Sequence, residues 1–167
     1  TSTKPSRTMG SGSPVTISDH QAGSAMGYSN ATKLSGSVAD TSKRESWHQR
    51  IADAINDQDV QLQYQLLVCD TGVLELQREI LARILDKSGI PCAAGEFISI
   101  VKDLGLIVEL DRAVVTQTLA YLRKNPNCQP LTINLSTAAI RNAEFQHWLI
   151  TAVDGTKNLN LELNEVS

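Results

Sequence analysis

Two charged side chains, Glu79 and Arg83, lie in the run REILARI, where their neighbours are mostly Ile, Leu and Ala. A charge that leaves water without meeting a partner is costly, so each of these groups needs a ligand or a neighbouring polar group. If the run is a strand, Glu79, Leu81 and Arg83 share one face, and the Cα atoms of Glu79 and Arg83 lie about 13 Å apart at ~3.3 Å per residue. That separation is too long for one simple pair. It favours contacts with two parts of one elongated ligand.

Polar stripes also follow two later segments in which apolar and polar residues alternate. Their polar positions are Thr132, Asn134 and Ser136 in the first and Asn160, Glu162 and Asn164 in the second. Oxygen donors such as Glu79, Asn134 and Glu162 suit a hard cation like Mg²⁺ or Mn²⁺ better than zinc. In a parallel barrel such groups gather at the carboxyl ends of the strands, which predicts a metal site. The alternative is that they are exposed residues of edge strands.

The periodicity of the chain predicts the elements that position these residues. We expect a first helix from Ser46 to about Asn56, opened by a capping box of Ser46 and Gln49. Alternation then predicts a strand over 60–68, a turn at 69–72 and a hairpin partner from Val73 to about Leu85. Further helices are expected over 95–104, 107–125 and 145–153, and further strands over 131–136 and 159–166.

This order of elements predicts an α/β fold. The first two strands form an antiparallel hairpin, and the later strands, separated by helices, pair in parallel. Because the sequence stops directly after a strand, we expect an open sheet edge and a truncated domain over residues 42–167. Residues 1–41 are rich in Ser, Gly and Thr, and we expect a flexible linker or the end of a preceding domain there.

Composition limits the classes of function. The 167 residues suffice for one domain with a core, since 41% are hydrophobic. A net charge of −3 and an aromatic content of 4% argue against binding to DNA or RNA, so an anionic ligand would need metal ions or a few placed Arg and Lys residues. Three widely spaced cysteines favour free thiols in a reducing compartment. The sequence holds no standard phosphate-binding loop, and its three histidines are scattered.

From about Trp47 to its last residue the sequence resembles the EAL domains, bacterial phosphodiesterases that act on cyclic di-GMP. Glu79-Ile80-Leu81 stands where the family has Glu-Ala-Leu, and Arg83 stands at the position of the arginine that follows. Four further segments resemble family motifs in the same order: YQLLVCDTGVL, GEFISIVKDLGLI, INLS and LELNEV. One such match would be weak evidence, whereas five in register are strong.

The resemblance implies a fold, a ligand and a set of site residues. The fold would be the N-terminal half of a TIM-like (β/α)₈ barrel that begins with an antiparallel hairpin. Glu79, Asn134 and Glu162 would bind Mg²⁺ or Mn²⁺, Arg83 would contact a phosphate or the nucleotide near it, and Gln65 and Leu81 would line the nucleotide site. In intact relatives two cations promote hydrolysis of cyclic di-GMP to linear pGpG. The expected location is the cytoplasm, either free or as the cytoplasmic part of an inner-membrane protein.

Several features depart from the family pattern. Ile80 replaces Ala, Leu66 and Ser99 each replace Pro, and Lys102-Asp103 stands where two acidic residues are usual. A family barrel is also about twice as long, in line with the ~250 residues of this architecture, so a further metal-binding Glu and the catalytic Lys are expected to be missing. We therefore expect no appreciable turnover from this segment alone.

Two alternative functions stay open on this evidence. The first is a catalytically inactive EAL receptor, similar to the LapD type, that binds cyclic di-GMP and signals to a partner. The second is a piece that neither binds nor cuts the nucleotide and serves in interaction or as a homodimer. In each case we expect other modules of a longer signalling protein as partners.

Overall fold

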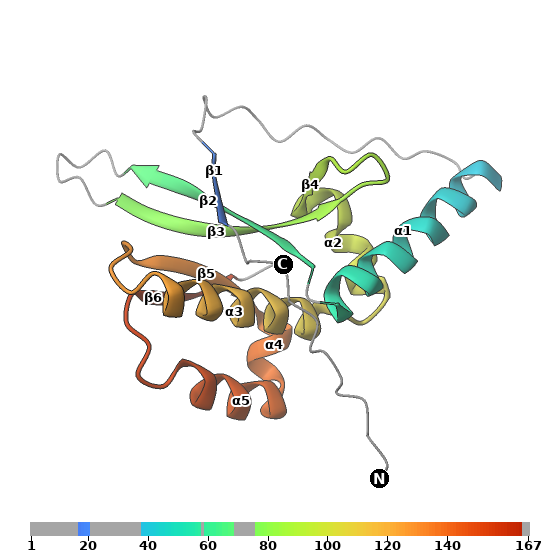
Figure 1. Ribbon diagram of the computed structural model, residues 1–167. Coiled ribbons are helices and arrows are strands. Elements are labelled where there is room, and N and C mark those ends of the chain that lie inside the picture. Colours follow the sequence, from blue (N-terminus) through green and yellow to red (C-terminus); the bar gives the residue numbers. More distant parts are fainter. Residues whose placement is uncertain (1–16, 21–37, 58, 69–75, 165–167) are drawn as a thin grey trace, which may run out of the picture.

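The computed structural model describes residues 17–20, 38–57, 59–68 and 76–164. These residues form a mixed α/β fold, as predicted (Figure 1). The elements are β1 Ile17–His20, α1 Val38–Asn56, β2 Gln61–Val68, β3 Leu76–Leu85, β4 Pro91–Ala93, α2 Ala94–Asp103, α3 Ile107–Lys124, β5 Leu131–Ser136, α4 Thr137–Arg141, α5 Ala143–Val153 and β6 Leu159–Asn164.

The strands form one sheet in the order β1-β2-β3-β5-β6, with β4 paired to β3 beside this path. Strands β2 and β3 are antiparallel, and β3–β5 and β5–β6 are parallel, so the predicted hairpin and crossovers are confirmed. Strand β1 adds to the outer edge of β2 in parallel. Among the described residues the sheet stays open and does not close into a barrel.

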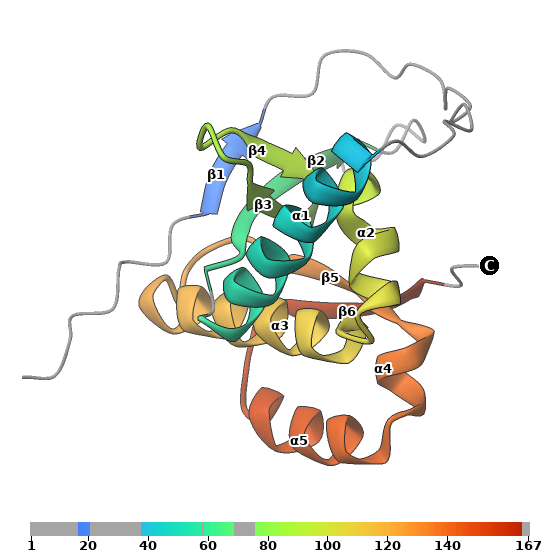
Figure 2. The same cartoon turned by 90° about the vertical axis from the view of Figure 1, so that its right-hand side faces the viewer.

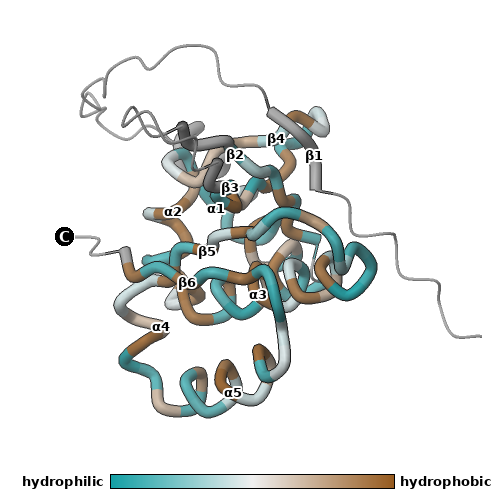
Figure 3. The backbone as a smooth tube through the Cα atoms, turned by 90° about the vertical axis from the view of Figure 1, so that its left-hand side faces the viewer, coloured by the Kyte–Doolittle hydropathy of each residue, from teal (hydrophilic) through white to brown (hydrophobic). Residues whose placement is uncertain are grey.

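Helices α1, α2 and α3 lie on one side of the sheet, in front of the strands in Figure 2. The core fills the space between these helices and the sheet face that carries Leu62, Ile80 and Ile133, each at most 5% exposed. The side chains of Phe97 and Phe145 are fully buried in it. In Figure 3 hydrophobic and hydrophilic stretches alternate along the described backbone, as expected of elements with one buried face.

The long helix α3 shows why its sequence is helical. Its buried positions recur mostly at steps of three and four residues and so form one broad face: Leu110, Asp111, Ala113, Val114, Val115, Gln117, Thr118, Leu119 and Leu122. The turn before it is a Schellman motif, in which Gly105 has a φ of 69°, its N–H donates to the Lys102 carbonyl, and the Leu106 N–H donates to the Val101 carbonyl. This motif ends α2 and directs the chain into α3.

The helix start predicted at Ser46 is wrong. Helix α1 begins at Val38, so Ser46 lies in its interior and does not cap it. The sequence hides this start because residues 38–46 hold one large apolar side chain and show no helical period. Within the helix, Arg44 forms an exposed ion pair with Asp103 of α2.

Three short elements were not predicted. Strand β4 and helix α4 are three and five residues long, too short to show a period. Strand β1 lies inside the segment expected to be a linker or the end of a preceding domain. The boundary between residues 41 and 42 stays a prediction, and the turn predicted at 69–72 lies outside the described residues. Within the described part of the chain, no helix combines the length and apolar character that crossing a membrane requires.

Candidate functional site

Strands β3, β5 and β6 bring the three predicted metal ligands together. Glu79 lies opposite Thr132 in the β3–β5 ladder, and Asn134 lies opposite Glu162 in the β5–β6 ladder. The Nδ2 atom of Asn134 donates a hydrogen bond to Oε1 of Glu79. Since directly opposite residues of a ladder point to the same side, all three side chains project from the sheet face turned away from the helices.

The exposure of these residues bears on the alternative that they are exposed residues of edge strands. Glu79 and Asn134 belong to β3 and β5, which have neighbouring strands on both sides, and both are half-buried. Glu162 lies on β6, which is an edge strand among the residues that the structure describes, and it is exposed. The alternative therefore describes Glu162 and does not describe Glu79 or Asn134.

Glu79 and Arg83, the two charged residues singled out above in the run REILARI, meet polar partners in the fold. Glu79 accepts its hydrogen bond from Asn134, and Arg83 donates through Nε to Oε1 of Gln63 at 3.1 Å. A second hydrogen bond joins Nη1 of Arg83 to the carbonyl oxygen of Ala82, also at 3.1 Å. The two charges thus interact with different strands, β5 and β2, and do not form a pair with each other.

The remaining predicted contacts with the nucleotide lie beside these residues on the same face. Gln65 of β2 is opposite Glu79, and Leu81 of β3 is opposite Gln63. Both Gln65 and Leu81 are half-buried. All six predicted site residues therefore share one face of four neighbouring strands, β2, β3, β5 and β6.

Two residues that contact the strands of the predicted site were missed by the sequence analysis. Gln63 belongs to the alternating Gln stripe of β2, so strand parity places it beside Gln65, but no pattern in the sequence shows its bond to Arg83. Asp111 interrupts the apolar stripe of α3 with a carboxylate, and such an interruption is a signal that could have been used.

Asp111 ties helix α3 to the carboxyl end of β5. Its Oδ2 accepts the backbone N–H of Ser136 at 2.8 Å, and the Ser136 hydroxyl in turn accepts the Ala139 N–H and caps helix α4. Ser136 follows Asn134 by two residues and so shares its face. Burial raises the pKa of the Asp111 carboxyl, while its hydrogen bonds to Ser136 act in the opposite direction.

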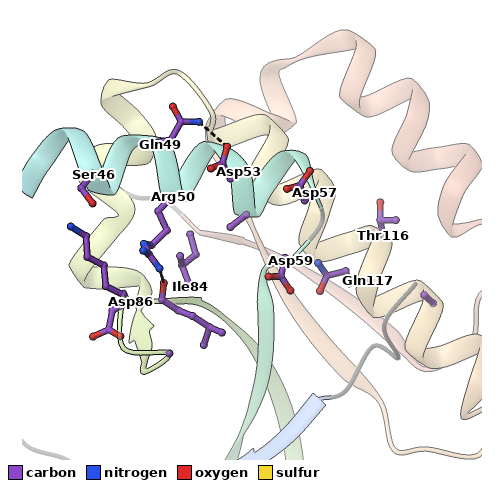
Figure 4. Close-up of a pocket in the computed structure, with 15 residues that line it drawn as sticks. Ser46, Gln49, Arg50, Asp53, Asp57, Asp59, Ile84, Asp86, Thr116 and Gln117 are labelled. Carbon is purple, nitrogen blue, oxygen red and sulfur yellow. Dashed lines mark hydrogen bonds between the residues drawn. The ribbon is translucent and has the colours of Figure 1, made fainter. Parts of the chain in front are cut away.

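A large cavity lies elsewhere, between α1, the turn after β3 and α3 (Figure 4). Its volume is about 1100 Å³, and its wall includes Asp53, Asp57 and Asp86 together with Arg50, which donates to the Leu85 carbonyl at 3.4 Å. None of the six predicted site residues lines it. The predicted site is an open face of the sheet and not this cavity.

The described residues supply a limited set of metal donors. No three His, Cys, Asp or Glu side chains gather among them at distances suited to one metal ion. The sheet face turned away from the helices, which carries Glu79, Asn134 and Glu162, is called the polar face below; its predicted metal donors are the two carboxylates of Glu79 and Glu162 and the side-chain amide of Asn134. This mixed oxygen set is of the kind that Mg²⁺ and Mn²⁺ prefer.

Solved structures with a similar fold are EAL domains. The EAL domain of FimX from Pseudomonas aeruginosa, bound to c-di-GMP, matches 70% of this chain at 21% identity and a TM-score of 0.60. The S helix-GGDEF-EAL part of Vibrio cholerae LapD, also bound to c-di-GMP, matches 73% at 21% identity and a TM-score of 0.61. The EAL enzyme Bd1971 in its cGMP-bound form matches 76% at 19% identity and a TM-score of 0.56.

The chain covers only part of each of these structures, namely 49% of the FimX domain, 30% of the LapD chain and 38% of Bd1971. At these identities the likeness concerns the fold. No curated protein matches the sequence. The EAL domain family matches residues 48–167, which is most of the chain and includes every predicted site residue. The chain therefore belongs to the EAL domain family.

Proposed function

We propose that this chain binds cyclic di-GMP on the polar face of its sheet, as part of a bacterial signalling protein. The observation that carries the proposal is the convergence of Glu79, Asn134 and Glu162 from three adjacent strands on the face that also presents Arg83. Membership of the EAL domain family supports it, as do the c-di-GMP-bound FimX and LapD structures, which share the fold.

A divalent cation is part of this proposal. The ligand carries two phosphate charges and the chain a net charge of −3, so binding needs positive charge at the contact. Glu79 and Glu162 supply carboxylate oxygens, and Asn134 supplies an amide oxygen. The Nδ2 atom of Asn134 donates a hydrogen bond to Glu79, so these two side chains already lie together. These three residues would hold Mg²⁺ or Mn²⁺. When bound, such an ion neutralises phosphate charge and lowers the pKa of a coordinated water.

The other residues of the face have separate roles. Arg83 binds a phosphate oxygen through its guanidinium, which suits phosphate geometry better than an ammonium group does. Leu81 lies between Arg83 and Glu79 on β3, and Gln65 lies opposite Glu79 on β2, and both line the nucleotide in this proposal. Glu79, held by Asn134, keeps its second carboxylate oxygen for the cation.

Calorimetric titration of cyclic di-GMP into the chain tests the proposal. In the presence of Mn²⁺ we expect saturable binding by the wild type and at least about 10-fold weaker binding by Arg83→Ala, because a charge-assisted phosphate contact is lost. Arg123→Ala is the matched control, since Arg123 is an exposed guanidinium in the last turn of α3, outside the polar face. A folded wild-type sample that shows no binding would contradict the proposal and favour the second alternative above, a piece that neither binds nor cuts the nucleotide.

The nucleotide recovered after incubation distinguishes a phosphodiesterase from a receptor. If the parent protein is a phosphodiesterase, incubation with Mn²⁺ and cyclic di-GMP releases pGpG, which chromatography separates from the substrate. If it is a receptor of the LapD type, binding occurs and the nucleotide is recovered unchanged. The same assay on the chain itself tests the expectation that this segment alone gives no appreciable turnover.

A location in the cytoplasm and an organisation with residues 42–167 as the EAL domain belong to the same proposal. The three widely spaced cysteines, which favour a reducing compartment, support the location. Limited proteolysis tests the domain boundary: because α1 begins at Val38, we expect a stable product that begins close to residue 42, at or just before the start of this helix, and that persists longer when cyclic di-GMP and Mn²⁺ are present. A stable product that retains residues 1–41 would contradict the boundary.

A further inference from the structure

The contact between Gln63 and Arg83 joins two strands on the polar face. Gln63 is half-buried on β2, and its Oε1 accepts the Nε–H of Arg83 on β3 at 3.1 Å. Arg83 also donates from Nη1 to the carbonyl oxygen of its neighbour Ala82. The guanidinium is planar, so one bond at Nε and one at Nη1 together fix both its position and its orientation.

These two bonds determine which part of the guanidinium is offered to a ligand. A guanidinium has five N–H groups, and among the described residues two of the five are engaged, which leaves three, including both on Nη2. The Nε side is occupied by Gln63, so a phosphate is met by the end that carries Nη1 and Nη2. An arginine held in this way loses less conformational freedom when it binds than a free one.

The contact does not simply follow from strand register. The residue directly opposite Arg83 in the ladder is Gln61, not Gln63. Yet the side chain of Gln61 turns to Asp59, where its Nε2 lies 3.1 Å from Oδ1 and 3.4 Å from the carbonyl oxygen. Gln63, at the diagonal position, therefore makes a specific contact that its equivalent neighbour on the same strand does not make.

We propose that Gln63 is a positioning residue of the nucleotide site, which orients the Arg83 guanidinium toward a phosphate oxygen of the bound ligand. The inference rests on the proposed function for its ligand, and it adds a residue that acts through Arg83. Gln63 needs no contact with the nucleotide for this role. Its effect on binding must therefore depend on the Nε donor of Arg83.

A double-mutant cycle in calorimetry with cyclic di-GMP and Mn²⁺ tests this dependence. We expect Gln63→Leu to weaken binding about 3- to 10-fold, the range for ordering one flexible side chain, and Gln61→Leu to stay within about 2-fold of the wild type. In an Arg83→Lys background, which keeps the charge and removes the Nε donor, Gln63→Leu should change affinity by less than about 2-fold. Equal losses in the two backgrounds would overturn the inference, as would a Gln63→Leu affinity equal to that of the wild type.

An NMR measurement separates this inference from the proposed function. The Arg83 Nε–H signal should be observable and slow to exchange in the free wild type and in Gln61→Leu, and fast to exchange in Gln63→Leu. A protected signal in a wild type that does not bind cyclic di-GMP would overturn the proposed function and the role of Gln63 in it, although the contact exists. If the wild type binds cyclic di-GMP but its Arg83 Nε–H exchanges as fast as that of Gln63→Leu, this inference alone is overturned.

Discussion

Replacement of Asp111 by Ala should destabilise the domain more than replacement of a typical surface carboxylate. Asp111 is 9% exposed, and its Oδ2 accepts the Ser136 backbone N–H at 2.8 Å. Loss of an acceptor that leaves a backbone N–H away from water costs about 1–3 kcal/mol. Ala gains roughly 0.5 kcal/mol of helix propensity, so the net loss in free energy of unfolding should be about 0.5–2.5 kcal/mol.

Asp103 provides the matched control for this experiment. It also lies in a helix, so the gain in propensity on change to Ala is similar, but its partner is Arg44 in an exposed ion pair, which is worth about 0–1 kcal/mol at most. Urea denaturation followed by circular dichroism at pH 7 measures both variants. If Asp111→Ala costs no more than Asp103→Ala, the link between α3 and the carboxyl end of β5 is not the restraint described above.

Three further predictions concern the same framework. Burial raises the pKa of Asp111 above its ordinary value of 3.8, so the folded chain binds more protons than the unfolded chain in the pH window just above that value. Relative to Asp111→Asn, the wild type should therefore lose stability as the pH rises through this window. A stability difference that stays flat or grows in urea titrations across the window would contradict the burial argument. The Asn142 side chain accepts the Phe145 N–H at 2.8 Å and caps α5, so Asn142→Ala should lower the free energy of unfolding by about 0.5–2 kcal/mol in the same assay. An unchanged free energy of unfolding would mean that α5 does not depend on this cap. The Phe145 side chain is fully buried, so Phe145→Ala should cost about 3–5 kcal/mol, and a loss below about 1 kcal/mol would mean that α5 does not pack on the core as described.

The longer elements could be predicted from the sequence because each buries one regular face. Strand β5 shows clear alternation and was placed at its observed bounds, and the polar face of β3 followed from parity alone. The start of α1 was missed because its first turns are polar and show no helical period, and the ion pair that Arg44 makes there is with Asp103 of another helix. A contact of that kind leaves no period in the local sequence.

The candidate site was predictable to a similar extent. Parity placed Glu79, Asn134 and Glu162 on polar faces, but the register that brings Asn134 to Glu79 depends on how β5 aligns with β3. The role of Gln63 depends on side-chain rotamers, since Gln61 and Gln63 look equivalent in the sequence and differ only in the partners they meet. Strand alternation indicates which face a residue occupies and does not indicate its partner.

The most direct test of the account is whether Glu79, Asn134 and Glu162 hold a divalent cation together. Electron paramagnetic resonance of Mn²⁺ reports free ion, and the signal falls when the ion binds to the protein. We predict that the wild-type chain with cyclic di-GMP binds Mn²⁺, that Glu79→Gln and Glu162→Gln each weaken this binding about 10-fold or more, and that the exposed control Glu144→Gln does not. Equal Mn²⁺ binding by the wild type and by the variant that carries both Glu79→Gln and Glu162→Gln would contradict the account.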